Sequence, residues 1–202
     1  MKAVIFDYGA GNLHSLAKAL EMDGVAVEVE SDPRQAVKGD VLVLPGVGAF
    51  GAAVARMADG RDAMRDAILG GLPTIGICLG MQLLFDASDE GTGAGLGVIP
   101  GRVRRLAAKR VPQIGWNDLD LIVSESLFAE APLPIAYYAN SFVCRPNDER
   151  TVMAWSSHEN DRFPAAVRAG RAIGVQFHPE KSSMAGVRFL HAFLRESAGT
   201  ER

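Results

Sequence analysis

A short buried strand that turns directly into a helix is predicted by the segment Pro73-Thr74-Ile75-Gly76-Ile77-Cys78-Leu79-Gly80. Residues 73–77 form an apolar run bounded by a proline, and a helical pattern follows over residues 79–85. Cys78 stands at the corner, with Gly76 and Gly80 two residues to either side. This is the G-x-nucleophile-x-G form of a nucleophile elbow, in the strand-to-helix context that the motif requires.

The rest of the first half alternates strand and helix patterns around this elbow. Short strands are predicted at residues 2–6, 26–30 and 41–44, and helices at 12–23, 52–57 and 62–69. Such alternation is typical of a parallel sheet covered by helices on both faces.

The second half is richer in strands. Strands are predicted at residues 102–106, 135–142, 151–156 and 171–177, and an amphipathic helix at 183–195. Residues 86–101 contain five glycines and are predicted to form a loop. No repeat or shift in composition divides the chain, so we expect one α/β domain over residues 1–202, with a mostly parallel central sheet flanked by helices and additional strands in its second half.

Composition narrows the functional classes. The 202 residues are 48% hydrophobic and 22% charged, with a net charge of −3, which does not suggest a nucleic-acid-binding surface. The basic residues at 102–110 lack interleaved aromatics and are predicted to be solvated. No apolar stretch is long enough to span a bilayer. The N-terminus does not resemble a secretory signal, so we expect a cytoplasmic protein with two free thiols.

Cys78 is the expected nucleophile. Its position at a helix N-terminus favours the thiolate, and the backbone N–H of Leu79 would be free to bind a developing oxyanion. The alternative is a buried structural cysteine in a glycine-bearing turn. Cys144 has no glycine pair and no following helix, so we expect it to be a half-buried strand thiol.

His178 is the expected proton shuttle among the four histidines. It follows the strand at 171–177, and parallel-sheet enzymes collect catalytic groups at the carboxyl ends of strands. Pro179 disfavours helix at His178, and residues i and i+2 of extended chain point the same way, so Glu180 should reach the imidazole. His14 and His191 lie in helical patterns, and His158 lies in a polar stretch predicted to be a solvated loop.

Two glycine-containing loops follow other strands. In Pro45-Gly46-Val47-Gly48-Ala49, the backbone N–H groups could supply a second oxyanion donor, although a plain turn before a helix is an equal alternative. Tyr8-Gly9-Ala10-Gly11-Asn12 suggests a dinucleotide site, but the third glycine of that fingerprint is replaced by His14. Since the sequence also lacks a Walker loop, an HExxH motif and paired CxxC motifs, we expect no metal and no cofactor.

Three passages together resemble the class I glutamine amidotransferases: GICLGMQ at 76–82, PGVG at 45–48 and GVQFHPEKSS at 174–183. Within that class, YGAGNL at 8–13, LPGVGAF at 44–50 and PQIGWN at 112–117 are similar to the glutaminase subunits of imidazole glycerol phosphate synthases. These motifs are spread over nearly the whole chain.

The resemblance implies a heterodimer in which this chain hydrolyses glutamine to glutamate and ammonia. The partner, a cyclase with a (β/α)8 barrel, would use the ammonia in histidine biosynthesis. The implied roles are a triad of Cys78, His178 and Glu180, oxyanion donors at Val47 and Leu79, substrate contacts at Gly46, Gly48, Gln82 and Ser141, and a partner-facing surface at Trp116 and Lys181. One departure is Asn140-Ser141-Phe142, where many relatives carry His-Ser/Thr-Tyr.

Two other functions compete with this interpretation. A free-standing cysteine hydrolase of γ-glutamyl or related amides would use the same nucleophile and base. A non-catalytic amidotransferase-like module would keep the fold for interaction alone, although degenerate copies commonly lose the cysteine.

Overall fold

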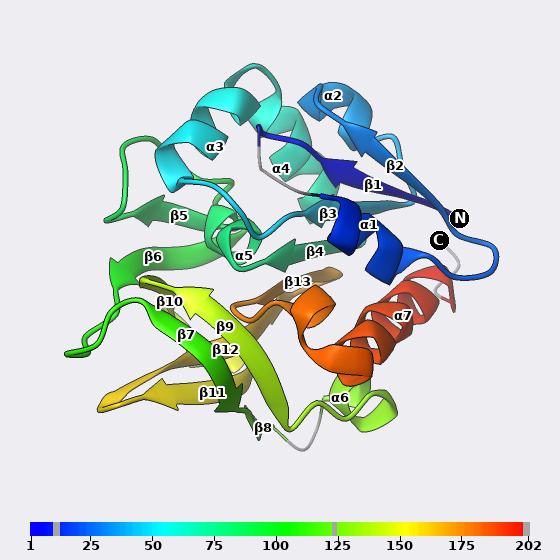
Figure 1. Cartoon of the computed structure of the whole chain (residues 1–202). Helices are drawn as coiled ribbons and strands as arrows, with labels where there is room; N and C mark the ends of the chain where they lie inside the picture. The colour runs from blue at the N-terminus through cyan, green and yellow to red at the C-terminus, as the bar shows by residue number, and fades with distance from the viewer. Residues whose placement is uncertain (10–12, 123–124, 200–202) are drawn as a thin grey trace.

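An eight-stranded sheet forms the centre of the computed structural model, which describes residues 1–9, 13–122 and 125–199 (Figure 1). Its strands, in spatial order, are β2 (Ala26–Glu30), β1 (Lys2–Phe6), β3 (Val41–Leu44), β4 (Thr74–Ile77), β13 (Ala172–Val175), β12 (Asp161–Ala169), β11 (Val152–His158) and β8 (Asp120–Leu121). The pairings from β2 to β13 are parallel, and those from β13 to β8 are antiparallel. The predicted α/β class with a mostly parallel sheet and additional strands in the second half is confirmed.

Helices cover both faces of this sheet, which explains why β3, β4 and β13 are buried along their whole length. In β1, Ala3 and Ile5 belong to one apolar cluster, while Val4 and Phe6 belong to the other. The first cluster includes α1 (His14–Leu20), α6 (Ser126–Glu130) and α7 (Ser183–Gly199). The second includes α2 (Pro33–Ala36), α3 (Phe50–Met57), α4 (Arg61–Leu69) and α5 (Leu79–Leu83).

Two small sheets extend the molecule beyond the central sheet. One has the order β10 (Phe142–Pro146), β6 (Ile99–Arg105), β5 (Phe85–Ser88), and the other pairs β7 (Gln113–Asp118) with β9 (Ile135–Asn140). The predicted loop at 86–101 is therefore wrong at both ends, because its first residues pair with β6 and its last belong to β6. The single strand predicted at 135–142 is also wrong, since the chain leaves one small sheet and enters the other at Ser141.

Strands β7 and β12 were not predicted. β12 is nine residues long but contains Pro164 and several alanines, which have low strand propensity. Its pairing with β11 is irregular near this proline, where Trp155 faces Pro164 after a shift in register. Tertiary pairing thus overrides local propensity here.

Several side-chain predictions can be compared with the fold. The basic residues at 102–110 are exposed, as expected. Cys144 is completely buried on β10 rather than half-buried. His158 ends β11 instead of lying in a loop, and its Nε2 hydrogen-bonds the carbonyl oxygen of Arg110 at 2.8 Å.

None of the helices among the described residues combines the length and the apolar character that a membrane span requires.

Candidate active site

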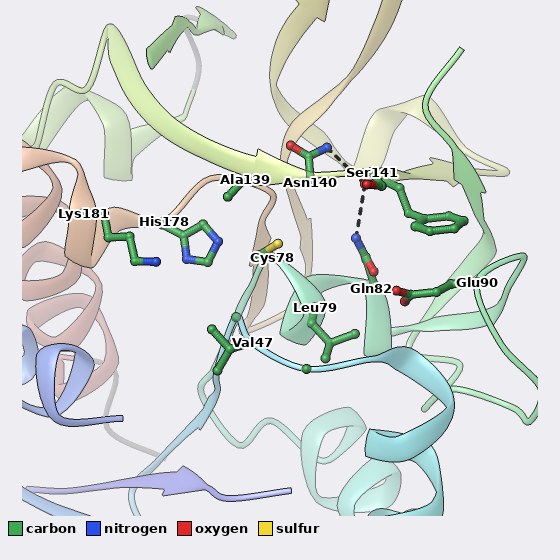
Figure 2. Close-up of a pocket in the computed structure, with 13 residues that line it drawn as sticks. Val47, Cys78, Leu79, Gln82, Glu90, Ala139, Asn140, Ser141, His178 and Lys181 are labelled. Atoms are coloured by element: carbon green, nitrogen blue, oxygen red, sulfur yellow. Dashed lines mark hydrogen bonds between the residues drawn. The ribbon is translucent and has the colours of Figure 1, made fainter. Parts of the chain in front are cut away.

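Three neighbouring parallel strands end at the same edge of the central sheet, and each is followed by residues of the candidate site. β3 leads into Pro45 and the glycine loop, β4 leads into Cys78, and β13 leads through Gln176 and Phe177 into His178. Figure 2 shows Cys78 and His178 side by side, with Val47 and Leu79 below them in this view. The topology therefore gathers groups that lie far apart in the sequence.

Cys78 occupies a strained corner. Its backbone has φ 47° and ψ −101°, and its N–H donates to the carbonyl oxygen of Val175 at 2.7 Å. The glycines two residues to either side lie against each other, and a Cβ on Gly80 would overlap the backbone carbonyl of Leu44. The strained dihedral angles hold the thiol at the start of α5, which fits a nucleophile elbow.

His178 is held from both its backbone and its ring. Its side chain is only 2% exposed, and its N–H donates to the carbonyl oxygen of Tyr137 at 2.8 Å. Nδ1 lies 2.8 Å from a carboxylate oxygen of Glu180, which leaves Nε2 as the nitrogen available to Cys78. His178 is extended, as predicted, but Glu180 reaches it from a single 3₁₀ turn over Pro179–Lys181 instead of from extended chain.

The charge balance of the site favours a protonated imidazole. Burial alone would lower the pKa of His178, but the hydrogen bonds to Cys78 and Glu180 and their negative charges outweigh it. The net result is a pKa raised from 6.5 to about 9. Such a histidine can pair with a thiolate and donate a proton to a leaving group.

A cavity of about 320 Å³ opens above the thiol (Figure 2). It gathers nine of the residues expected at the site together with four others: Gly46, Val47, Gly48, Cys78, Leu79, Gln82, Glu90, Ala139, Asn140, Ser141, Phe142, His178 and Lys181. Glu180 lies behind the histidine and lines a second cavity of about 150 Å³, which Val47 and Lys181 share. Trp116 lies outside both cavities, 51% exposed on β7, with its ring edge-on to Tyr137.

The departure at 140–142 has a structural explanation. Asn140 Nδ2 donates to the carbonyl oxygen of Phe142 at 3.1 Å, and Gln82 Nε2 donates to the same oxygen at 3.2 Å. Asn140 therefore stabilises the passage from β9 to β10 at Ser141, and the Gln82 contact ties this passage to α5.

Sequence reasoning missed Glu90 and the site role of Tyr8. Glu90 lies between β5 and β6, lines the cavity, and accepts a hydrogen bond from the N–H of Phe50 at 3.1 Å. The Tyr8 hydroxyl donates to the carbonyl oxygen of Pro45, at the start of the glycine loop. No sequence pattern around Glu90 marks it as a site residue, because only the folding of the 86–101 segment brings it to the cavity. Tyr8 could have been suspected, since it follows a strand at the same sheet edge.

Gly46 packs directly against the histidine. A Cβ at this position would lie 2.8 Å from Cε1 of His178 and 3.0 Å from Cγ2 of Ile77. We therefore expect Gly46→Ala to displace either the loop or the imidazole, and to lower kcat about 10²-fold. Gly199→Ala is a useful contrast, because no neighbouring atom of the described residues lies within 4 Å of the added Cβ and its φ is not positive. A Gly46→Ala enzyme with unchanged kcat would contradict this packing.

Comparisons with known proteins are in line with this geometry. The family model described as "Glutamine amidotransferase class-I" matches residues 4–196. The chain is 41% identical over 202 residues to a Corynebacterium glutamicum protein called "Imidazole glycerol phosphate synthase subunit HisH", covering 94% of this chain and 96% of that one. A protein of the same name from Halobacterium salinarum is 41% identical over 200 residues, covering 95% and 91% of the two chains.

Solved structures share the fold at lower identity. One described as "Crystal structure of glutamine amidotransferase" aligns with a TM-score of 0.74 at 20% identity, covering 98% of this chain and 99% of that chain. Another, "Structure of PurLQS from Thermotoga maritima", aligns with a TM-score of 0.75 at 19% identity, covering 96% and 98%. The structures support the fold, while the family match and the relatives near 40% identity decide the family. The chain belongs to the class I glutamine amidotransferases.

Proposed function

We propose that this chain is the glutaminase subunit of an imidazole glycerol phosphate synthase. It hydrolyses glutamine to glutamate and ammonia, and it passes the ammonia to a cyclase barrel subunit for histidine biosynthesis in the cytoplasm. The observation that carries the proposal is the grouping of Cys78, His178 and Glu180 beside a cavity that Gln82 also lines. Both cysteines are free thiols, which suits a reducing compartment.

The first half of the reaction forms a thioester. The Cys78 thiolate attacks the side-chain carbonyl carbon of glutamine, and the carbonyl oxygen becomes an oxyanion. Leu79 and Val47 line the cavity beside the thiol, and their backbone N–H groups are the proposed donors to this oxyanion. Each such donor is worth about 10²–10³-fold in rate. The raised pKa of His178 lets the imidazolium give its proton to the departing ammonia.

The second half releases glutamate. His178, now neutral, accepts a proton from water, and the resulting hydroxide attacks the thioester carbonyl. Collapse of this intermediate breaks the C–S bond and restores the thiolate–imidazolium pair. Glu180 keeps Nδ1 protonated and orients the ring through both halves.

Substrate recognition is assigned to two parts of the cavity wall, the segment 140–142 and the glycine loop. Ser141 and the backbone around it, with Gly46 and Gly48, line the space for the substrate's polar groups, and Gln82 holds the segment 140–142 through the carbonyl oxygen of Phe142. We add Glu90, whose carboxylate is the acidic group among the lining residues and suits the α-ammonium group of glutamine.

Glu180→Gln should be milder than His178→Ala. Loss of the proton shuttle should lower kcat by about 10²–10⁴-fold. Loss of the orienting charge should lower it by roughly 10- to 100-fold, the effect of one hydrogen bond to a charged group. Equal losses would indicate a direct chemical role for Glu180.

The pH dependence of the same variants supplies a second check. Glu180 raises the pKa of His178, so the parent should lose activity as the pH rises through about 9. In Glu180→Gln this loss should begin at lower pH, because the imidazolium is less stabilised. The measurement is kcat against pH, and an alkaline limb that does not move would contradict the assignment.

The partner surface is assigned to the ribbon of β7 and β9. Ile114, Trp116 and Ile135 are exposed on it by 68%, 51% and 43%, an apolar group suited to an interface. Lys181 lies where the cavities meet and is the proposed charged contact. Co-purification of a barrel subunit with the tagged chain tests this assignment, and its loss in Trp116→Ala tests the surface. A free-standing hydrolase would purify alone and show full activity.

A further inference from the structure

Gln176 lies beside the nucleophile without being assigned to the triad. The parallel register of β13 and β4 pairs Val175 with Ile77, so the next residues along each strand are Gln176 and Cys78. The Gln176 side chain is completely buried, and its Nε2 donates to Cys78 Sγ at 3.5 Å. The sulfur therefore has an amide partner as well as the imidazole.

Both partners come from one strand end. Gln176 and His178 stand two residues apart just beyond β13, and the side chains of both hydrogen-bond Cys78. We propose that Gln176 is a further catalytic residue, whose amide N–H stabilises the Cys78 thiolate by a hydrogen bond. This inference rests on the proposed function, in which Cys78 is the nucleophile.

A neutral donor suits this position. Burial disfavours a thiolate, and a hydrogen bond to the charged form opposes that effect. An amide carries no charge, so it stabilises the sulfur without competing with Glu180 for the histidine or repelling the imidazolium. A lysine there would place a second positive charge against His178.

A purely structural role does not explain the amide well. Gln176 Oε1 is buried and, among the described residues, has no hydrogen-bond partner. Such an unpaired polar atom destabilises a fold, and an apolar side chain of similar size would avoid this penalty. A residue kept for packing alone would be better served by methionine, so stability and reactivity should respond differently to its replacement.

The test is Gln176→Met in a Cys144→Ala background, where Cys78 is the remaining thiol. The alkylation rate of the full chain with iodoacetamide is measured from pH 5 to 10, alongside glutamine hydrolysis and the thermal unfolding midpoint. We expect alkylation at pH 7 to fall about 10- to 100-fold, with its midpoint at higher pH, while the unfolding midpoint is unchanged or higher. Glutamine hydrolysis should fall through kcat with little change in KM.

Gln113→Met is the matched control. Gln113 is another buried glutamine whose Oε1 has no partner among the described residues, but it lies on β7 and pairs with Asn140 of β9, not with the strand that leads into Cys78. Its replacement should leave the alkylation profile unchanged. If Gln176→Met does not fold, Gln176→Asn decides the matter, because the amide shortened by one methylene withdraws from the sulfur and should give the same fall.

Three results would overturn the proposal. The first is an unchanged alkylation profile in folded Gln176→Met or Gln176→Asn. The second is an equal fall in Gln113→Met. The third is faster alkylation in Gln176→Met, which would mean that the amide oxygen faces the sulfur and opposes the thiolate. Failure of the proposed function would look different, because the parent itself would then hydrolyse no glutamine with its partner present.

Discussion

Cys78→Ala should abolish glutamine hydrolysis, with kcat falling by roughly 10⁴-fold or more, because the change removes the nucleophile of the triad. The change deletes one sulfur atom and leaves the cavity walls in place, so glutamine should still bind. The measurements are glutamate release and calorimetric glutamine binding on the same preparation. Turnover at the parent rate would refute the nucleophile assignment, and lost binding with lost activity would point to a collapsed elbow.

Cys144→Ala is the internal control for this prediction. Burial raises the pKa of the Cys144 thiol well above its usual value, which keeps it protonated and unreactive. Its loss should cost about 1 kcal/mol of folding stability and leave kcat within about twofold. A large loss of activity would mean that the wrong thiol was chosen.

The elbow and the histidine could be predicted because each is a local feature at a strand end. Strands β1, β2 and β3 have the boundaries expected from their short apolar or alternating runs. Cys78 and His178 follow β4 and β13, and because these two strands are parallel neighbours, their carboxyl ends bring both side chains to one edge of the sheet.

The rest of the site depends on pairings that no local pattern specifies. β5 forms because it pairs with β6, and this pairing delivers Glu90 to the cavity. No local sequence pattern marks Gln176 either, because its position beside Cys78 follows from the register between β13 and β4. The YGAGN segment suggests a dinucleotide site in the sequence, but its residues Ala10 to Asn12 lie outside the described residues. Its first residue, Tyr8, contacts the glycine loop instead.

Glutamine hydrolysis by the isolated chain should be slow and should rise at least about 100-fold with the cyclase partner and its nucleotide ligand bound, roughly 3 kcal/mol of barrier. The reason lies in the product. Ammonia released into water is mostly protonated, and ammonium is not a nucleophile, so the enzyme gains by withholding hydrolysis until the second site is occupied.

The glycine loop is the proposed switch. Tyr8 anchors the Pro45 carbonyl, and Gly46 lies against His178, so the start of the loop is held. Val47 keeps a negative φ, since the non-glycine residues with positive φ in the described part of the chain are Cys78, Glu159 and Ser183. Rotation of the Gly46–Val47 peptide would turn the Val47 N–H toward or away from the oxyanion. Val47 and Lys181 line both cavities, so a partner bound at Lys181 can act on this peptide.

Two rates measured together separate this switch from activation of the thiol. Iodoacetamide alkylation requires the Cys78 thiolate but no oxyanion donor, whereas glutamine hydrolysis requires both. Adding the partner and then its nucleotide ligand should therefore raise hydrolysis at least about 100-fold while alkylation changes less than about threefold. A parallel rise in both rates would place the switch at the Cys78–His178 pair. Full hydrolysis by the isolated chain would refute gating and favour a free-standing hydrolase, because its oxyanion donors would already be aligned without any partner.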